Sequence, residues 1–71
     1  MMSSIIELLE YRRAKIWFAE NKERVRRSFK GMYIAVLGEK VIDHDKDKFL
    51  LIRRLWSEGL FPGPVVIEYV D

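Results

Sequence analysis

The sequence predicts an α+β fold in the element order α-β-β-α-β, with two helices beside a small three-stranded antiparallel sheet. Three observations support this prediction. Tyr33–Leu37 is an uninterrupted apolar run, which is typical of a strand buried on both faces at the centre of a sheet. Gly38-Glu39 follows as a two-residue loop with glycine first, which is typical of a type II′ hairpin turn. A further apolar segment, Val65–Val70, closes the chain behind a loop with two prolines.

A long N-terminal helix is expected to begin at Ser4, because Ser4 and Glu7 have the spacing of a capping box. It should end at about Arg27 or Phe29, before Gly31. At about 100° per residue, its apolar side chains fall into two stripes. The first stripe consists of Ile5, Leu8, Leu9, Ile16 and Ala19. The second stripe consists of Tyr11, Ala14, Phe18, Val25 and Phe29.

Two apolar stripes on one helix require two packing partners. The second stripe adjoins the hairpin in the sequence and is expected to cover the sheet. The first stripe is left for another copy of the chain, for another protein, or for a bend or break that folds the helix into one small core, and these alternatives stay open. Trp17 lies beside the first stripe, and tryptophan often anchors interfaces. The predicted protein interface is therefore Ile5, Leu8, Leu9, Ile16, Trp17 and Ala19.

Short-range signals predict the remaining elements. Lys40–Ile42 is expected as the second strand, and the polar segment Asp43–Asp47 as a turn in which Asp45 or Asp43 caps the next helix. Gly59 should end that helix. The apolar positions of the helix are Phe49, Leu50, Ile52, Leu55 and Trp56, with Trp56 expected in the core.

The two-sided apolar character of Tyr33–Leu37 also predicts the strand order. If this strand is central, the last strand pairs with it on the side away from Lys40–Ile42. The order is then 2-1-3, all antiparallel, with the helices on one face of the sheet. A parallel pairing of the last strand against Lys40–Ile42 is the alternative. Within the last strand, Val65, Ile67 and Tyr69 should face one way and Val66, Glu68 and Val70 the other.

The composition limits the classes of protein to consider. A chain of 71 residues, 49% apolar and 34% charged, is expected to form one folded domain. Because it has no cysteine and one histidine, disulfides and Cys/His zinc sites are excluded, and oligomerisation remains as a way to reinforce so small a fold. No run is apolar enough to span a membrane and no signal peptide precedes the first helix, so a cytoplasmic location without membrane contact is expected. The absence of Gln and Thr, with many Lys, Arg and Glu, indicates a thermophile.

Charge is unevenly distributed along the chain. Residues 1–30 carry 8 Lys/Arg against 4 Glu, a balance of +4, and residues 31–71 carry 5 basic against 7 acidic side chains, a balance of −2. A basic helix end can follow phosphates, and Trp17, Phe29 or Tyr33 could offer bases a stacking face. A solvated helix face whose cations suit the helix dipole is the alternative. The candidate nucleic-acid-binding residues are Lys22, Arg24, Arg26, Arg27 and Lys30.

One cluster of side chains that can ligate metals follows the hairpin: Asp43, His44, Asp45 and Asp47. It lacks the glycine and the distal glutamate of an EF-hand loop, and helix capping already explains one or two of the aspartates. No metal site is therefore predicted. Neither serine outside the first four residues lies in a sequence context that activates a nucleophile. The sequence predicts no enzyme, no catalytic residues, no cofactor and no small-molecule substrate.

The hairpin has a pattern of its own, since Phe29–Ile42 begins aromatic-x-Gly-x-aromatic and continues with apolar residues. The acidic Asp43–Asp45 then leads into a helix, and the chain closes with the strand Pro64–Val70. In these segments the chain resembles a family of short, mainly archaeal proteins with a domain of unknown function. The resemblance covers residues 18–71 and implies that residues 1–17 are an N-terminal helical extension of a single domain. It implies no catalytic set.

Together these features predict a small binding or scaffold protein that acts through self-association, as a dimer, or through a protein partner. The N-terminal helix is the expected contact element, and concentration-dependent stability is the expected consequence. The alternative is a nucleic-acid-binding protein that uses the basic end of the same helix. Its affinity would fall steeply as salt rises.

Overall fold

The computed structural model describes residues 5–71 and has the α+β architecture that the sequence predicts. Ser4, where the helix was expected to begin, lies outside the described residues. In chain order the described elements are α1 (Ile5–Glu20), α2 (Lys22–Phe29), β1 (Tyr33–Leu37), β2 (Lys40–Asp45), α3 (Lys48–Ser57) and β3 (Val66–Tyr69). These residues form three helices, whereas the sequence predicted two.

The three strands form one antiparallel sheet in the order β2-β1-β3, as predicted. The alternative parallel pairing of the last strand with the second strand is wrong, because β3 pairs antiparallel with β1. The hairpin between β1 and β2 closes through the pair Leu37 and Lys40. Gly38 has a φ of +61°, and Glu39 has no positive φ, which is the combination of a type II′ turn. Glycine is required at the first of these two positions because its φ is positive.

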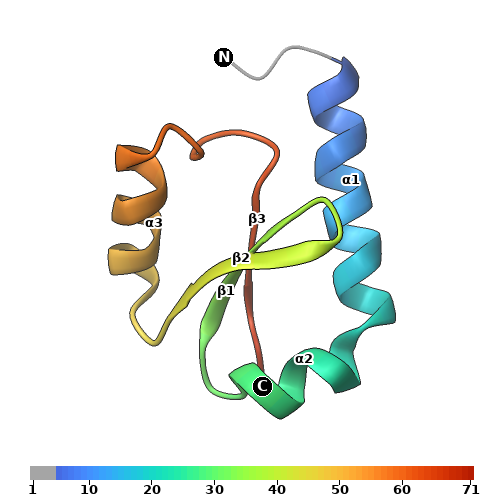
Figure 1. The fold of residues 1–71 in the computed structure, drawn as a ribbon, viewed down its shortest axis with the longest axis vertical. Coiled ribbons are helices and arrows are strands. Elements are labelled where there is room, and N and C mark those ends of the chain that lie inside the picture. Colours follow the sequence, from blue (N-terminus) through green and yellow to red (C-terminus); the bar gives the residue numbers. More distant parts are fainter. Residues whose placement is uncertain (1–4) are drawn as a thin grey trace.

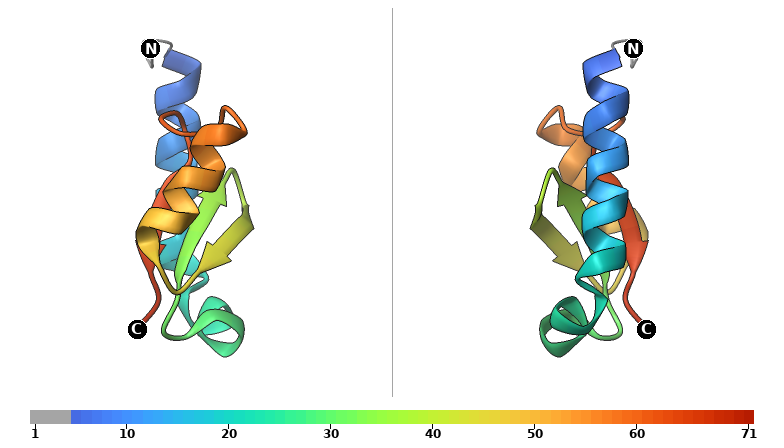
Figure 2. Two further views of the ribbon diagram at one scale, coloured as in Figure 1. Left: turned by 90° about the vertical axis from the view of Figure 1, so that its left-hand side faces the viewer. Right: turned by 90° about the vertical axis from the view of Figure 1, so that its right-hand side faces the viewer.

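The helices cover both faces of the sheet, and the prediction that they cover one face is wrong. Figures 1 and 2 show α1 on one side of the strands and α3 on the other. Ile34 and Val36 of β1 pack in a cluster with Ala14 and Phe18 of α1. Ala35, between them in the strand, packs on the other face in a cluster with leucines of α3. Neighbouring side chains of a strand point to opposite faces, so a strand that is apolar at every position needs a cover on each face.

The last strand shows the predicted alternation. Val66 and Val70 belong to the cluster under α1, whereas Val65 and Ile67 belong to the cluster under α3. The backbone N–H of Gly31, between α2 and β1, donates to the carbonyl of Val70 at 2.7 Å, just after β3. The last strand thus contributes side chains to both clusters of the core, and its end is hydrogen-bonded to the segment before β1.

The predicted N-terminal helix is broken at Asn21, which separates α1 from α2. The side-chain amide of Asn21 donates to the carbonyl of Trp17 at 2.8 Å, and its backbone N–H turns to the carbonyl of Phe18 at 3.2 Å. The side chain thus takes the carbonyl that a continuing helix would use for the backbone bond. The break turns α2 under the end of the sheet (Figure 1), where Val25 joins the cluster under α1.

Helix α3 begins at a different cap and buries different residues than predicted. Asp47 is the N-cap, and its carboxylate accepts hydrogen bonds from the backbone N–H groups of Phe49 and Leu50. The predicted cap at Asp45 or Asp43 is wrong. Leu51 and Leu55 are fully buried, four residues apart on one face. Because residues 49–52 are all apolar, the period of the pattern does not say which of them faces the core.

Candidate interaction surface

The first apolar stripe of the N-terminal helix lies on the solvent side of α1. Ile5, Leu9 and Ile16 expose 71%, 58% and 48% of their surface, while Ala14 on the opposite side of the helix is fully buried. We call the exposed set the outer seam. The outer seam consists of Ile5, Leu8, Leu9, Ile16 and Ala19, all of them exposed. The helix is broken at Asn21, as one alternative expected, but within residues 5–71 this break does not cover the outer seam.

The burial of both tryptophans differs from the sequence prediction. Trp17, predicted as an exposed anchor, is half-buried and packs against the cluster under α1. Trp56, predicted in the core, is 63% exposed on α3, and Phe49 is 80% exposed. Because α3 packs on the sheet through Leu51 and Leu55, Trp56 and Phe49 lie on other faces of the helix.

A groove of about 350 Å³ lies along residues 9–20 of α1, beside the outer seam. Its lining combines apolar side chains of α1 with charged side chains and one residue of the hairpin turn. Trp17 forms part of this lining, so it contributes to the predicted surface from a half-buried position. The lining residues are Leu9, Arg12, Arg13, Ile16, Trp17, Glu20 and Glu39.

Most charges beside the outer seam are paired within the chain. The Nε of Arg13 lies 3.4 Å from the carboxylate of Glu39, and the Nζ of Lys15 lies 3.3 Å from that of Glu68. Arg12 and Glu20 form no ion pair among the described residues. Arg12 lies three residues after Leu9 and four before Ile16, on the same face of α1, and the sequence alone predicted no role for it.

The basic charge belongs to α2, and the expectation of one long basic helix is not confirmed. Residues 5–20 carry three acidic and three basic side chains, a balance of zero, whereas residues 22–29 carry four basic side chains and one Glu, a balance of +3. All five candidate nucleic-acid-binding residues are exposed: Lys22, Arg24, Arg26, Arg27 and Lys30.

Two of these cations have partners. Arg26 lies 3.8 Å from the carboxylate of Glu23 and donates from Nε to the backbone carbonyl of Asp71 at 3.1 Å. Lys22 lies over the ring of Phe18, 5.9 Å from its centroid. No ion pair of Arg24, Arg27 or Lys30 is found in residues 5–71.

A second hollow, of about 280 Å³, lies between α2 and the hairpin. Trp17 and Phe29 both line it, together with Arg24, Lys40 and the acidic Glu39. Tyr33, the third predicted stacking residue, instead packs in the cluster under α3, and its ring centroid lies 5.0 Å from that of Tyr69. Two of the three predicted aromatic side chains therefore lie close to basic side chains.

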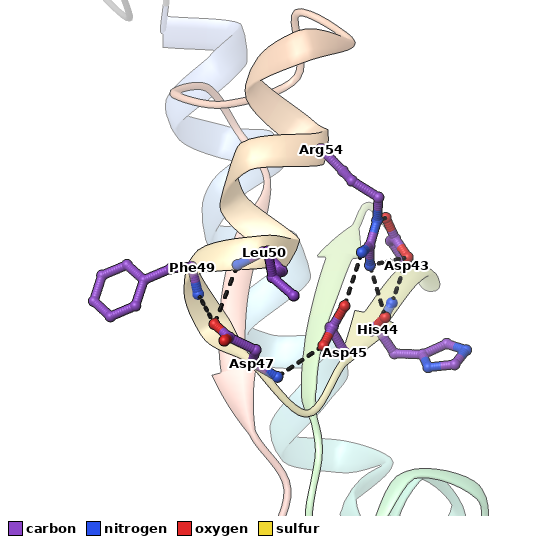
Figure 3. Close-up of polar contacts among 7 residues, drawn as sticks. All are labelled: Asp43, His44, Asp45, Asp47, Phe49, Leu50 and Arg54. Atoms are coloured by element: carbon purple, nitrogen blue, oxygen red, sulfur yellow. Dashed lines mark hydrogen bonds and ion pairs between the residues drawn. The ribbon is translucent and has the colours of Figure 1, made fainter.

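The acidic residues at the end of β2 are arranged around Arg54, as Figure 3 shows, and belong to the strand where a turn was predicted. The guanidinium donates to both carboxylate oxygens of Asp43 at 3.1 Å and to Asp45 at 2.8 Å. It also donates to the backbone carbonyl of His44 at 2.9 Å. The carboxylate of Asp45 accepts a hydrogen bond from the backbone N–H of Asp47 at 2.8 Å. This bond closes the turn between β2 and α3.

In this arrangement the carboxylates of the cluster form ion pairs and a helix cap. The Asp43 and Asp45 carboxylates face Arg54, and Asp47 faces the start of α3. The imidazole of His44 contacts the ring of Phe29, with centroids 5.0 Å apart. Within residues 5–71 no group of three or more His, Cys, Asp or Glu side chains gathers in a way that could hold a metal ion.

The same contacts shift two pKa values. The hydrogen bonds from Arg54 hold the pKa of Asp43 below its ordinary value of 3.8. The backbone N–H of Asp47, followed by Arg54, lowers the pKa of Asp45 in the same direction. Since both carboxyls bind protons more weakly in the folded chain, their stabilising effect is fully present above about pH 4 and is lost as the pH falls through the folded-state values.

Replacing Arg54 with methionine should therefore destabilise the fold at neutral pH and have a smaller effect at about pH 2, because protonation of Asp43 and Asp45 removes the charges that Arg54 faces. Urea unfolding at pH 7, pH 4 and pH 2 measures this difference. Arg53→Met is the matched control, because Arg53 is exposed on the same helix and forms no ion pair among the described residues. An Arg54→Met effect of equal size at pH 7 and pH 2 would contradict the prediction.

No described helix has the length and apolar character needed to cross a membrane. We compared the chain with models of protein families, with curated proteins and with solved structures. None of the three comparisons gave a match, so the predicted resemblance to an archaeal family stays a prediction.

Proposed function

We propose that this protein is a small scaffold that works by self-association through the outer seam of α1. One observation carries the proposal: α1 is apolar on two opposite sides, and only one of them is covered by the sheet. An apolar stripe on a helix is normally buried against another element. The exposed leucine and isoleucine side chains of the outer seam form one stripe along the helix, as interaction sites do.

The size of the fold supports the same proposal. The stability of 71 residues is of the order of 4 to 11 kcal/mol, from about 0.05 to 0.15 kcal/mol per residue. The chain has no cysteine for a disulfide. Covering the outer seam would remove apolar surface from water at about 25 cal/mol per Å², which is a large addition for so small a core.

Sedimentation equilibrium of the purified protein tests the proposal. We expect the weight-average mass to rise from the monomer value of 8.5 kDa toward a multiple of it between about 1 µM and 1 mM. The association should respond little to salt, because the outer seam is apolar. A mass that stays at 8.5 kDa over the whole range would overturn the proposal.

Nucleic-acid binding by α2 is the second candidate function. It is favoured by the hollow in which Trp17 and Phe29 lie beside Arg24 and Lys40, since aromatic faces beside cations suit single-stranded nucleic acid. The exposed Arg27 and Lys30 extend the basic surface along the same short helix. A dimer would present two such surfaces, so the two candidate functions are compatible.

The dependence of nucleic-acid affinity on salt concentration tests this second candidate function. Fluorescence anisotropy with labelled single-stranded DNA, duplex DNA and RNA should show binding that weakens about tenfold or more between 50 and 200 mM salt. The double variant Arg24→Glu/Arg27→Glu should lose the binding, whereas Arg53→Glu on α3 should keep most of it. Unchanged anisotropy at both salt concentrations would exclude this function.

A further inference from the structure

The hollow of about 280 Å³ between α2 and the hairpin combines aromatic rings, cations and one carboxylate, and we call it the hairpin hollow. Trp17 and Phe29 are half-buried and line it from α1 and α2. Arg24 and Lys40 line it from α2 and β2, and neither forms an ion pair within residues 5–71. Sites for drug-sized ligands measure roughly 300–1,000 Å³, so the hairpin hollow has room for one small planar group.

The carboxylate in this lining belongs to Glu39, in the hairpin turn. Its Oε2 lies 3.4 Å from the Nε of Arg13, whereas its Oε1 has no hydrogen bond or ion pair within residues 5–71. A carboxylate oxygen accepts hydrogen bonds from N–H groups and repels phosphate. The ligand that fits therefore carries its negative charge toward Arg24 and Lys40 and an N–H donor toward Glu39.

We propose that the hairpin hollow receives one unpaired base of a single-stranded nucleic acid, and that Glu39 selects a base with an exocyclic amino group, such as cytosine. The rings of Trp17 and Phe29 contact the base, and Arg24 and Lys40 contact the phosphates beside it. Cytosine presents an amino group where uracil presents a carbonyl oxygen, so Glu39 accepts a hydrogen bond from the first and repels the second. The inference rests on the second candidate function, nucleic-acid binding by α2, and adds the form of the strand and the preferred base.

An unpaired base is required because a duplex hides the groups that the hollow contacts. In a duplex, neighbouring bases cover both faces of each base, and its pairing edge is already hydrogen-bonded. Arg27 and Lys30, both exposed, continue the cationic surface along α2 beyond the hollow. A single strand can thus place one base in the hollow and its next phosphates along α2.

A smaller hollow beside the end of β3 shows why cations and rings alone do not identify such a site. It measures about 180 Å³, and Lys22, Arg26 and Tyr69 line it. Arg26 already donates to the backbone carbonyl of Asp71, and Lys22 already lies over the ring of Phe18. These cations have partners within the chain, whereas those of the hairpin hollow form no ion pair among the described residues.

The expected preference for cytosine differs from that of strand binding without base selection. Proteins that bind single strands through charge and stacking alone have modest preferences, which come from stacking strength and backbone flexibility. Cytosine and uracil have rings of the same size, so these effects differ little between them. A carboxylate at the base edge separates the two, by less than a fully buried one would, because the side chain of Glu39 is 60% exposed.

Fluorescence anisotropy with labelled strands of deoxycytidine and of deoxyuridine, and with the same pair in RNA, tests the selection at about 50 mM salt. We expect the cytosine strands to bind at least about threefold more tightly. Glu39→Gln should remove most of this difference, because an amide can donate or accept. Glu10→Gln is the matched control and should keep the difference, since Glu10 also lies beside Arg13, at 3.5 Å, but does not line the hairpin hollow. A difference in only the DNA pair or only the RNA pair would identify that nucleic acid as the ligand.

Tryptophan fluorescence tests the place of binding. The chain has two tryptophans, and Trp56 is 63% exposed on α3, on the other side of the sheet (Figure 2). The variant Trp56→Phe keeps Trp17 as its one tryptophan. A cytosine strand should quench the emission of Trp17, because the bound base contacts the indole ring. A mixed-sequence duplex should leave this emission unchanged.

Three results would contradict the inference, and they are distinguishable. Strand binding that leaves the emission of Trp17 unchanged would place the strand outside the hairpin hollow, and nucleic-acid binding by α2 would stand. Equal affinities for cytosine and uracil strands, or the same difference in Glu39→Gln as in the wild type, would overturn the selection by Glu39. Strands that do not bind at about 50 mM salt would overturn the second candidate function itself.

Discussion

Replacing Ile16 with glutamate is expected to dissociate the assembly and to raise its dissociation constant at least about 100-fold. Each copy of the dimer would lose the burial of the exposed half of one isoleucine, worth about 0.7–1.5 kcal/mol, and would place a carboxylate in an apolar contact, which costs at least as much again. The two copies together therefore exceed the roughly 2.8 kcal/mol that corresponds to a factor of 100. The monomer fold should survive, because Ile16 is 48% exposed on the side of α1 away from the sheet and Glu suits a helix.

Sedimentation equilibrium of Ile16→Glu beside the wild type gives the result directly, and far-UV circular dichroism confirms that the helices remain. Ile5→Glu is a second variant with the same expected effect, and its position in the first turn favours an acidic residue. Phe49→Glu on α3 is the matched control, since Phe49 is an equally apolar and even more exposed side chain. Loss of association in Phe49→Glu, with Ile16→Glu unaffected, would move the interface from α1 to α3.

Replacing Leu51 with alanine is expected to remove about 2–5 kcal/mol of unfolding free energy, as for other fully buried leucines. Leu51 has no exposed surface and packs with Ala35 and Leu55 under the sheet. With a total stability of about 4 to 11 kcal/mol, this loss would leave the variant close to unfolding. Urea unfolding at neutral pH and fixed protein concentration measures the difference, because self-association would otherwise add a concentration-dependent term.

The neighbouring residue provides the control. Leu50 is the adjacent leucine of the same helix and is 45% exposed, so Leu50→Ala should cost less than Leu51→Ala, at about half the loss. Helix propensity is the same for both substitutions, which isolates the effect of burial. Equal losses in the two variants would contradict the observed orientation of α3.

The apolar stripes of α1 were predictable because helical periodicity is a local property. The spacing of Ile5, Leu9 and Ile16 places them on one side and Ala14 and Phe18 on the other, whatever the helix packs against. The structure buries Ala14 and Phe18 of the second stripe but leaves Tyr11 38% exposed, and it leaves the first stripe exposed. Which partner covers the outer seam is a property of another surface, so the sequence left it open and it stays a proposal.

The break at Asn21 and the orientation of α3 were not predictable in the same way. A single Asn fits a helix interior with a modest penalty, and its side chain ends the helix only where α2 must turn to bury Val25. In α3 the apolar run at residues 49–52 fits several orientations, and contact with Ala35 selects Leu51. The exposure of Trp56 follows from that selection.

Local patterns in the chain correctly predicted the features that depend on neighbouring residues: the central strand, the type II′ hairpin turn and the end of the helical segment before Gly31. Alternating side chains and positive-φ glycines act over a few residues, so they are visible in the chain. The covering of both faces by helices, the contacts of Asp43 and Asp45 with Arg54, and the exposure of the outer seam could be seen only in the folded chain. These features depend on contacts between segments far apart in the sequence, where packing volume and the pairing of charges select one arrangement among several that the local pattern allows.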